Sequence, residues 1–171
     1  MDSEDWYPGK RIVYPMDTLM IGDSIRVLRQ WDEPILLPLP FEFQYYGELF
    51  DSCVINANGW MALGSDAIKS RSATPWGIPG IGAPDPQLCP YYLDLFNDEN
   101  RIYFNGVFYH YIEEEGIFVV EWSGVEVREE IDPIFIEFQI LLYDAEIHNT
   151  ATGDGEIVFQ YRTGRLLAGP Q

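Results

Sequence analysis

The stretch Leu37–Gly64, LPLPFEFQYYGELFDSCVINANGWMALG, decides the fold that this sequence predicts. It begins with Pro38 and Pro40, which lack a backbone donor and therefore favour the edge of a sheet over a central strand. The side chains then alternate from Phe41 to Tyr46, where one set is wholly aromatic and the other is mostly polar. Since successive side chains of a strand point to opposite faces, this alternation predicts strands rather than helices.

Glycines mark the turns between these strands. Gly47 follows the first alternation and predicts a turn there. Asn58-Gly59 is a signal for a two-residue hairpin turn, in which both central residues have positive φ. A second such pair, Asn105-Gly106, predicts a hairpin between residues 101–104 and 107–113.

The same two-residue rhythm recurs along the rest of the chain. Its clearest instance is Ile134–Leu142, where every second residue is apolar. Further strands are predicted at residues 11–14, 24–31, 91–95, 118–122 and 157–161, the last with Ile157, Phe159 and Tyr161 facing inward. No stretch shows a convincing helical period over 11 or more residues, so the predicted fold is an all-β, antiparallel β-sandwich of jelly-roll type.

The length of 171 residues suits one domain with its own core. We expect a flexible N-terminal segment at residues 1–10, a single β-sandwich domain at 11–163 and a C-terminal tail at 164–171. Ser65–Pro90 contains five prolines and little periodicity, which predicts one long Pro/Gly-rich loop. Such loops are often functional, and the alternative is a crossover that covers an open sheet edge.

The formal net charge of -18 limits the partners of this chain. Nucleic acid and anionic membrane surfaces would be repelled, and no apolar run reaches the ~18 residues of a membrane span. The acidic N-terminus lacks the basic-then-apolar order of a signal peptide, so an exported protein would carry this chain as a mature fragment. The acidity fits a solvated surface, or else carboxylates that bind calcium.

The two cysteines, Cys53 and Cys89, leave two alternatives open. They are compatible with one disulfide, and equally with two free thiols that are partly buried. Neither has a CxxC spacing, so zinc is not indicated.

Candidate site residues are few, and none is catalytic. His110 and His148 have no metal-spaced partners, and there is no nucleophile-elbow motif. Aromatic rings stack on sugar faces, which makes exposed aromatic side chains candidate ligand-binding residues. These candidates are Trp76, Tyr91, Tyr109 and Tyr111. A calcium site is predicted at an oxygen-rich cluster formed by Asp94, Asn97, Asp98 and Asn100. Asn149 and Asp154 form a weaker second candidate.

Several segments together resemble a known family. Leu39–Gly64 resembles the recurring pattern L-P-F-x-F-x-F-Y-G followed by N-G-W, and LCPYYLDL, FVVEWSGVEV, FIEFQILLYD and GDGEIVFQY resemble its downstream motifs. That pattern is typical of β-sandwich accessory modules of large secreted bacterial proteins. These modules occur beside gingipain-like and subtilisin-like peptidases and sorting domains, and NIDO-type extracellular domains begin similarly. The resemblance covers about three quarters of the chain and places Asp94 at the family's acidic strand end.

The resemblance implies a non-catalytic module outside the cell or on its surface. Its expected role is adhesion, carbohydrate contact or domain spacing within a larger protein. No cofactor is required, and calcium is the one that the sequence allows. Expected partners are a glycan or a surface protein, together with neighbouring domains of the parent chain. The alternative is a hydrolase, either glycosidase or peptidase, with an unrecognised site.

Overall fold

The computed structural model describes residues 25–26, 34–65, 86–96, 106–127 and 135–165. Several sequence predictions lie outside these residues. They are the strand at 11–14, most of the strand at 24–31, the flexible N-terminal segment, most of the long loop with Trp76, and the first half of the 101–113 hairpin. Asn97, Asp98 and Asn100 of the predicted calcium site and residues 166–171 of the predicted tail also lie outside them.

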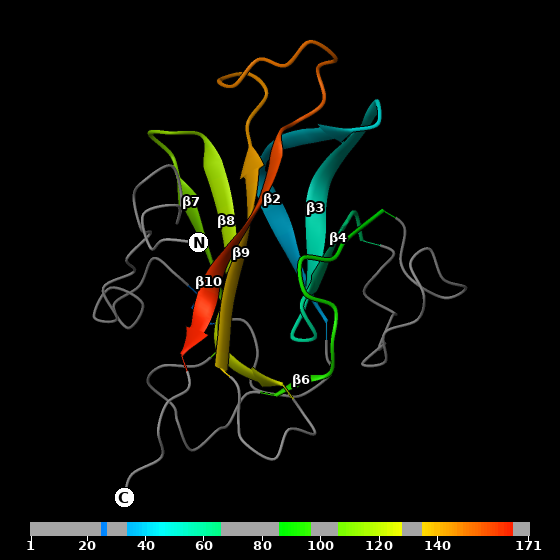
Figure 1. The fold of residues 1–171 in the computed structure, drawn as a ribbon. Helices are drawn as coiled ribbons and strands as arrows, with labels where there is room; N and C mark the ends of the chain where they lie inside the picture. The colour runs from blue at the N-terminus through cyan, green and yellow to red at the C-terminus, as the bar shows by residue number, and fades with distance from the viewer. Residues whose placement is uncertain (1–24, 27–33, 66–85, 97–105, 128–134, 166–171) are drawn as a thin grey trace, which may run out of the picture.

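Two antiparallel sheets face each other, as the all-β sandwich prediction requires (Figure 1). Sheet A has the order β1-β7-β8-β9-β10, with β6 beside β8; sheet B has the order β2-β3-β4-β5. The strands of sheet A are β1 (Ile25–Arg26), β6 (Leu95–Phe96), β7 (Gly106–Ile112), β8 (Ile117–Val127), β9 (Phe135–Tyr143) and β10 (Ile157–Arg165). Those of sheet B are β2 (Ile35–Tyr45), β3 (Glu48–Asn56), β4 (Trp60–Leu63) and β5 (Gln87–Leu88). Within the described part of the chain, no helix has the length and apolarity that a membrane crossing needs.

The β2–β3 hairpin forms as the sequence predicts. Tyr45 pairs with Glu48, which leaves a two-residue turn whose central residues both have positive φ, 50° at Tyr46 and 81° at Gly47. This geometry matches the right-handed twist of the two strands. β2 is the outer strand of sheet B, so its two prolines lie on an edge, where a missing backbone donor is tolerated.

The turn at Asn58-Gly59 differs from the prediction. Asn56 pairs with Trp60, so the loop has three residues, and of its last two only Gly59 has positive φ, at 76°. The backbone N–H of Asn58 donates to the Asn56 side chain at 2.8 Å instead. A three-residue loop ending in a left-handed glycine is the next most common hairpin connection. The predicted two-residue turn required Ala57 to pair with Trp60, but Ala57 lies in the loop and is unpaired.

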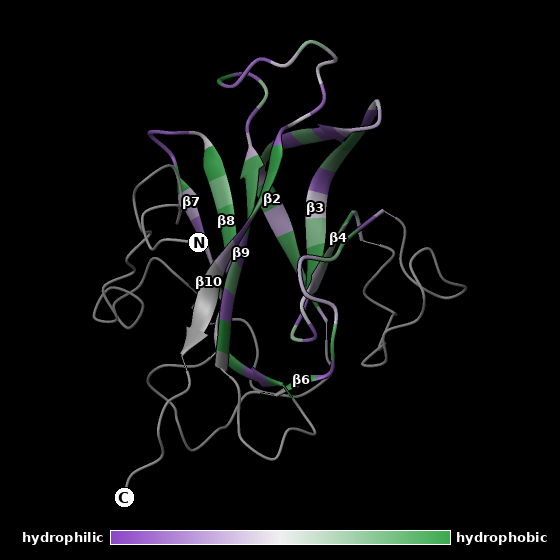
Figure 2. Ribbon diagram, in the orientation of Figure 1, coloured by the Kyte–Doolittle hydropathy of each residue, from purple (hydrophilic) through white to green (hydrophobic). Residues whose placement is uncertain are grey.

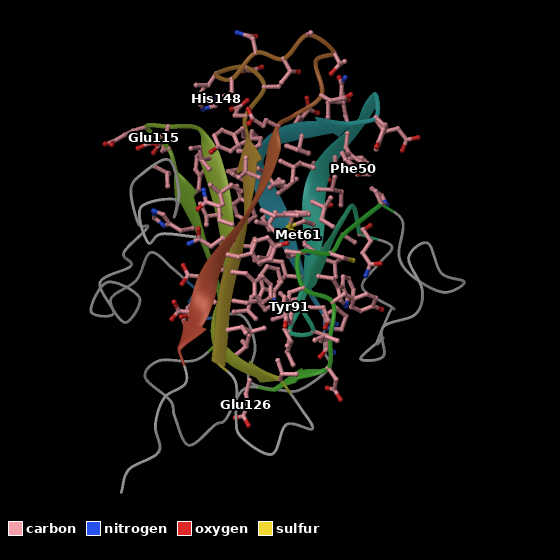
Figure 3. All side chains as sticks on the ribbon, viewed as in Figure 1. Phe50, Met61, Tyr91, Glu115, Glu126 and His148 are labelled. Carbon is pink, nitrogen blue, oxygen red and sulfur yellow. The ribbon has the colours of Figure 1, made fainter. Side chains whose placement is uncertain are left out.

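The core lies between the sheets and contains side chains from β2 to β10, whose ribbons carry many apolar residues (Figure 2). Cys53, Ile55, Met61 and Leu63 of sheet B meet Phe118, Val120, Trp122, Phe138, Ile140 and Leu142 of sheet A. The Trp122 and Phe138 rings stack with centroids 5.0 Å apart, and Met61 lies between the sheets in Figure 3. The alternation of each predicted strand therefore decides which residues are buried.

Three other predictions need correction. Tyr91–Asp94 is not a strand, because the Tyr91 N–H turns back to the Gly59 carbonyl at 3.4 Å; only Leu95 of the predicted strand pairs, within β6. The predicted long loop ends earlier than expected, since Gln87–Leu88 form β5. Gly106 is already the first paired residue of β7, opposite Ser123.

β10 faces inward only in part. Ile157 packs against the core, whereas Phe159 and Tyr161 stay 39% and 42% exposed. The reason is position: β10 is the outer strand of sheet A, with only β9 beside it among the described strands. The Tyr161 hydroxyl still reaches the Pro90 carbonyl at 2.8 Å.

Replacing Gly155 by alanine should destabilise the domain by about 1–3 kcal/mol through overpacking. A Cβ at this position would lie 2.1 Å from Cε2 of the buried Phe43 ring, which cannot move freely. Denaturant unfolding should show this loss in the free energy of unfolding. The loss should be smaller when Gly155→Ala is made on a Phe43→Leu background. Equal losses on both backgrounds would contradict this contact.

Candidate functional site

Three strand connections gather at one end of the sandwich, at the top of Figure 1, and form what we call the loop end. They are the β2–β3 turn at Tyr46-Gly47, the β7–β8 connection at residues 113–116, and the β9–β10 connection at residues 144–156. Loops positioned by a rigid sandwich often carry binding function, so this end is the first candidate surface.

Hydrogen bonds join the β9–β10 connection to the β2–β3 hairpin. The Gly155 N–H donates to the Gln44 carbonyl at 2.8 Å, and the Gly47 N–H donates to Asp154 Oδ1 at 2.9 Å. Gln44 Nε2 donates to the same carboxylate oxygen at 3.3 Å. The Gly47 N–H foremost, with side-chain donors from Gln44 and Thr152, holds the pKa of Asp154 below its ordinary value. Asp154 thus fixes sheet A to sheet B at this end.

A second set of contacts joins the β9–β10 connection to the β7–β8 connection. The Asp144 N–H donates to the Gly116 carbonyl at 2.9 Å, and His148 Nε2 lies 2.6 Å from the Glu115 carbonyl oxygen. The His148 ring also meets the Tyr143 ring edge-on, with centroids 4.9 Å apart. Figure 3 shows Glu115 and His148 near each other at this end. The three connections therefore form one continuous, hydrogen-bonded surface.

The loop end combines negative charge with exposed apolar side chains. Its connections contain no lysine or arginine, and they carry the carboxylates Glu113, Glu114, Glu115, Asp144, Glu146, Asp154 and Glu156. Tyr46 is 83% exposed and Ile147 is 53% exposed, while Leu49, just after the β2–β3 turn, is 61% exposed. Burial, followed by the Glu156 and Glu115 charges, raises the pKa of Tyr143. This chemistry suits recognition of a cationic partner with apolar groups.

The comparison with known families identifies the chain. A family model described as NIDO related matches residues 22–169, which is most of the sequence. The chain belongs to the NIDO-related family. No curated protein and no solved structure matches it. The sequence resemblance to a NIDO-like module is therefore confirmed, while the association with peptidases stays a prediction.

The predicted tyrosine platform of this NIDO-related domain is half-buried, and ligand binding by these side chains stays a prediction. Tyr91 stacks on Phe138 with centroids 5.6 Å apart, and its ring points among the core side chains in Figure 3. Tyr109 and Tyr111 also pack against the core between the sheets, and burial is the main cause that raises the pKa of each. Alternation alone could not show which aromatic face is covered, because both sheets supply aromatic residues.

The predicted calcium site lies mostly outside the described residues. Asp94 is the one predicted calcium ligand in the described ranges, and those ranges hold no group of three or more His, Cys, Asp or Glu side chains suited to a metal. In the weaker candidate, Asp154 accepts the loop-end hydrogen bonds described above. Calcium binding through Asp94 and its neighbours stays a prediction.

Of the two alternatives for the cysteines, the NIDO-related domain has free thiols, and the predicted disulfide is wrong for this structure. Cys53 faces the core between the sheets, whereas Cys89 packs with Val54 and Trp60 on the outer face of sheet B. Side chains on opposite faces of one sheet cannot be bridged without moving the backbone. Burial raises the pKa of both thiols to about 12.

A polar group on the outer face of sheet B was also missed by sequence analysis. Asn56 Nδ2, Trp60 Nε1 and Gln87 Nε2 are buried donors with no hydrogen-bond partner among the described residues. Asn56 and Trp60 are directly paired across β3 and β4, and both are closed off from solvent. A partner cannot reach them as the structure stands, so the loop end remains the candidate site.

Thiol labelling should distinguish free cysteines from a disulfide. Near pH 8 iodoacetamide should modify the folded domain slowly, because buried thiols with raised pKa values form little thiolate. In guanidinium both cysteines should react without prior reduction. A requirement for reductant before labelling would show that Cys53 and Cys89 pair after all.

The Asp154 carboxylate should make the stability of the domain pH-dependent. Its folded pKa is depressed, so its charge stabilises the fold above the ordinary value of 3.8, and this stabilisation is lost as the pH falls through the folded pKa. Wild type should exceed Asp154→Asn in denaturant midpoint near neutral pH, and the difference should vanish in strong acid. A difference that stays constant from neutral pH to strong acid would rule out this role for the charge.

Proposed function

We propose that this NIDO-related domain is a non-catalytic binding module that contacts a basic face of a protein partner through its loop end. NIDO-related domains are typically extracellular accessory modules, which is the setting that the proposal assumes. The observation that carries it is the pairing of exposed Tyr46, Leu49 and Ile147 with a set of acidic loops free of lysine and arginine.

The composition of the loop end supports a protein partner. Exposed aromatic and aliphatic side chains provide the area that becomes buried, and surrounding carboxylates select a positively charged face and speed its approach. The connections are held by bonds such as Gly47 N–H to Asp154 and Asp144 N–H to the Gly116 carbonyl. Such a surface is pre-organised, so less conformational freedom is lost on binding.

The backbone at Tyr46 adds to this argument. A non-glycine residue with φ of 50° is uncommon. The Tyr46 ring meets the neighbouring Tyr45 ring edge-on, with centroids 4.6 Å apart, yet Tyr46 stays 83% exposed. Asparagine or glycine would form the same turn with less strain. A large ring held in this position and exposed to solvent supports a role in contact with another molecule.

Two other assignments remain proposals for separate tests. Carbohydrate contact would depend on the aromatic side chains Trp76, Tyr91, Tyr109 and Tyr111. Calcium would depend on Asp94 with Asn97, Asp98 and Asn100. The hydrolase alternative would need turnover of generic glycoside or peptide substrates by the purified domain.

Peptide and glycan arrays, probed side by side, test the proposed function. We expect binding to cationic peptides that contain aromatic or aliphatic residues, with affinity that falls as salt rises. Tyr46→Asn, which keeps the turn, and Glu113→Gln/Glu114→Gln should each weaken this binding at least ~10-fold, or about 1.4 kcal/mol.

The matched control is Glu126→Gln, which neutralises a half-buried carboxylate at the end of the sandwich opposite the three connections (Figure 3). It should leave peptide binding unchanged. Peptide binding that tolerates the loop-end changes would overturn the proposal. Binding confined to glycans and lost in Trp76→Ala would replace it with the carbohydrate assignment.

A further inference from the structure

The outer edge of β10 differs from the other sheet edges that the structure describes. β1 and β5 are two residues long, and β2 carries Pro38, Pro40 and an irregularity in its pairing. These are the usual ways in which an edge is protected from pairing with another chain. β10 has nine residues without proline and pairs only with β9 among the described strands. Its pairing is regular from Ile157 to Arg162, and the register shifts only between Arg162 and Arg165.

The backbone groups of β10 that point away from β9 follow from the hydrogen bonding. The Tyr143 N–H donates to the Glu156 carbonyl at 3.0 Å, which makes these two residues a hydrogen-bonded pair. Because hydrogen-bonded and non-hydrogen-bonded pairs alternate, Val158 and Gln160 also bond to β9. Ile157, Phe159 and Tyr161 therefore direct their N–H and C=O groups outward.

We propose that β10 pairs antiparallel with β10 of a second copy of this chain, about a two-fold axis at Phe159. In this register Phe159 faces Phe159 of the second copy, and Ile157 faces its Tyr161. Phe159 and Tyr161 are 39% and 42% exposed, so pairing covers apolar surface that the monomer leaves in water. The dimer joins the two A sheets into one continuous sheet.

The charges along β10 select this partner and this register. The segment EIVFQYRTGR, residues 156–165, contains one acid and two of the ten basic residues in a chain of net charge -18. Centring the pair on Phe159 places Glu156 of each copy opposite Arg162 of the other. Registers centred on the neighbouring residues do not bring these two positions together, so the strand is complementary to itself in one alignment.

The rest of the molecule opposes the association. Each copy brings a net charge of -18, and this repulsion acts over a distance that salt shortens. A dimer held by one strand pair is also small compared with stable interfaces. We therefore expect a concentration-dependent dimer that becomes stronger, not weaker, as the ionic strength rises.

Sedimentation velocity of the full 171-residue chain tests the proposal directly. The chain should shift from monomer to dimer between about 10 μM and about 1 mM, more readily at high salt. A monomer throughout this range at both salt concentrations overturns the proposal, as do open-ended oligomers, since a two-fold strand pair is closed.

Charge reversal tests the register. Glu156→Arg places two arginines opposite each other, and Arg162→Glu places two glutamates opposite each other, twice in every dimer. Each variant alone should lose at least ~10-fold in association constant. An equimolar mixture should dimerise again, because the two variants complement each other. If the mixture stays monomeric, or if Glu156→Arg associates better merely because its net charge is lower, the proposed register is wrong.

A proline at Phe159 tests the edge itself. Phe159→Pro removes an outward N–H and leaves the bonds to β9, so the domain should melt cooperatively but fail to dimerise. Phe159→Val keeps the N–H and serves as the control that still pairs. Equal dimerisation of both variants would place the contact elsewhere, and an unfolded proline variant leaves the charge-reversal pair to decide.

Discussion

The hydrogen bond from the Trp122 indole to the Asn56 carbonyl, 3.0 Å long, joins the two sheets inside the core. A buried indole N–H needs an acceptor, and a carbonyl oxygen can accept a second hydrogen bond besides that of its ladder. β3 ends at Asn56, so its carbonyl can turn to sheet A. The stack of Trp122 on Phe138 then fixes the ring against β9, the neighbouring strand. The position of the β3–β4 loop and the packing of sheet A therefore depend on each other.

The same loop guides the chain from one sheet to the other. Asn58 Oδ1 accepts the Leu95 N–H at 3.1 Å, and the Gly59 carbonyl accepts the Tyr91 N–H. A Cβ on Gly59 would lie 1.9 Å from the Tyr91 carbonyl oxygen, so only glycine allows this approach. Residues 91–95 thus pass over the loop as they leave β5 and reach β6. The apolar side chains of residues 91–95 suggested a strand. In the structure they pack against this loop, and most of them do not pair in a ladder.

Sequence alone predicted the elements that depend on local rules. Alternation in β3, β4, β8 and β9 identifies their buried faces, and Pro38 and Pro40 place β2 on an edge. The loop end could not be predicted in this way. Its central bond, Gly47 to Asp154, joins residues 107 positions apart, and no local pattern encodes such a contact. The cysteines show the same limit, since pairing depends on which face of sheet B each one occupies.

Within each sheet, most neighbouring strands are also consecutive in sequence, as in β2-β3-β4 and β7-β8-β9-β10. Short hairpin closures cost less chain entropy than long ones, so each sheet has a local route to its own formation. Besides the pairing of β1 with β7 and of β6 with β8, the non-local step that remains is the docking of the two sheets through Trp122 and Asp154. The rate of docking, rather than the rate of strand pairing, would then set the folding time of the domain. Because no disulfide links its two cysteines, the domain would refold under reducing conditions as well.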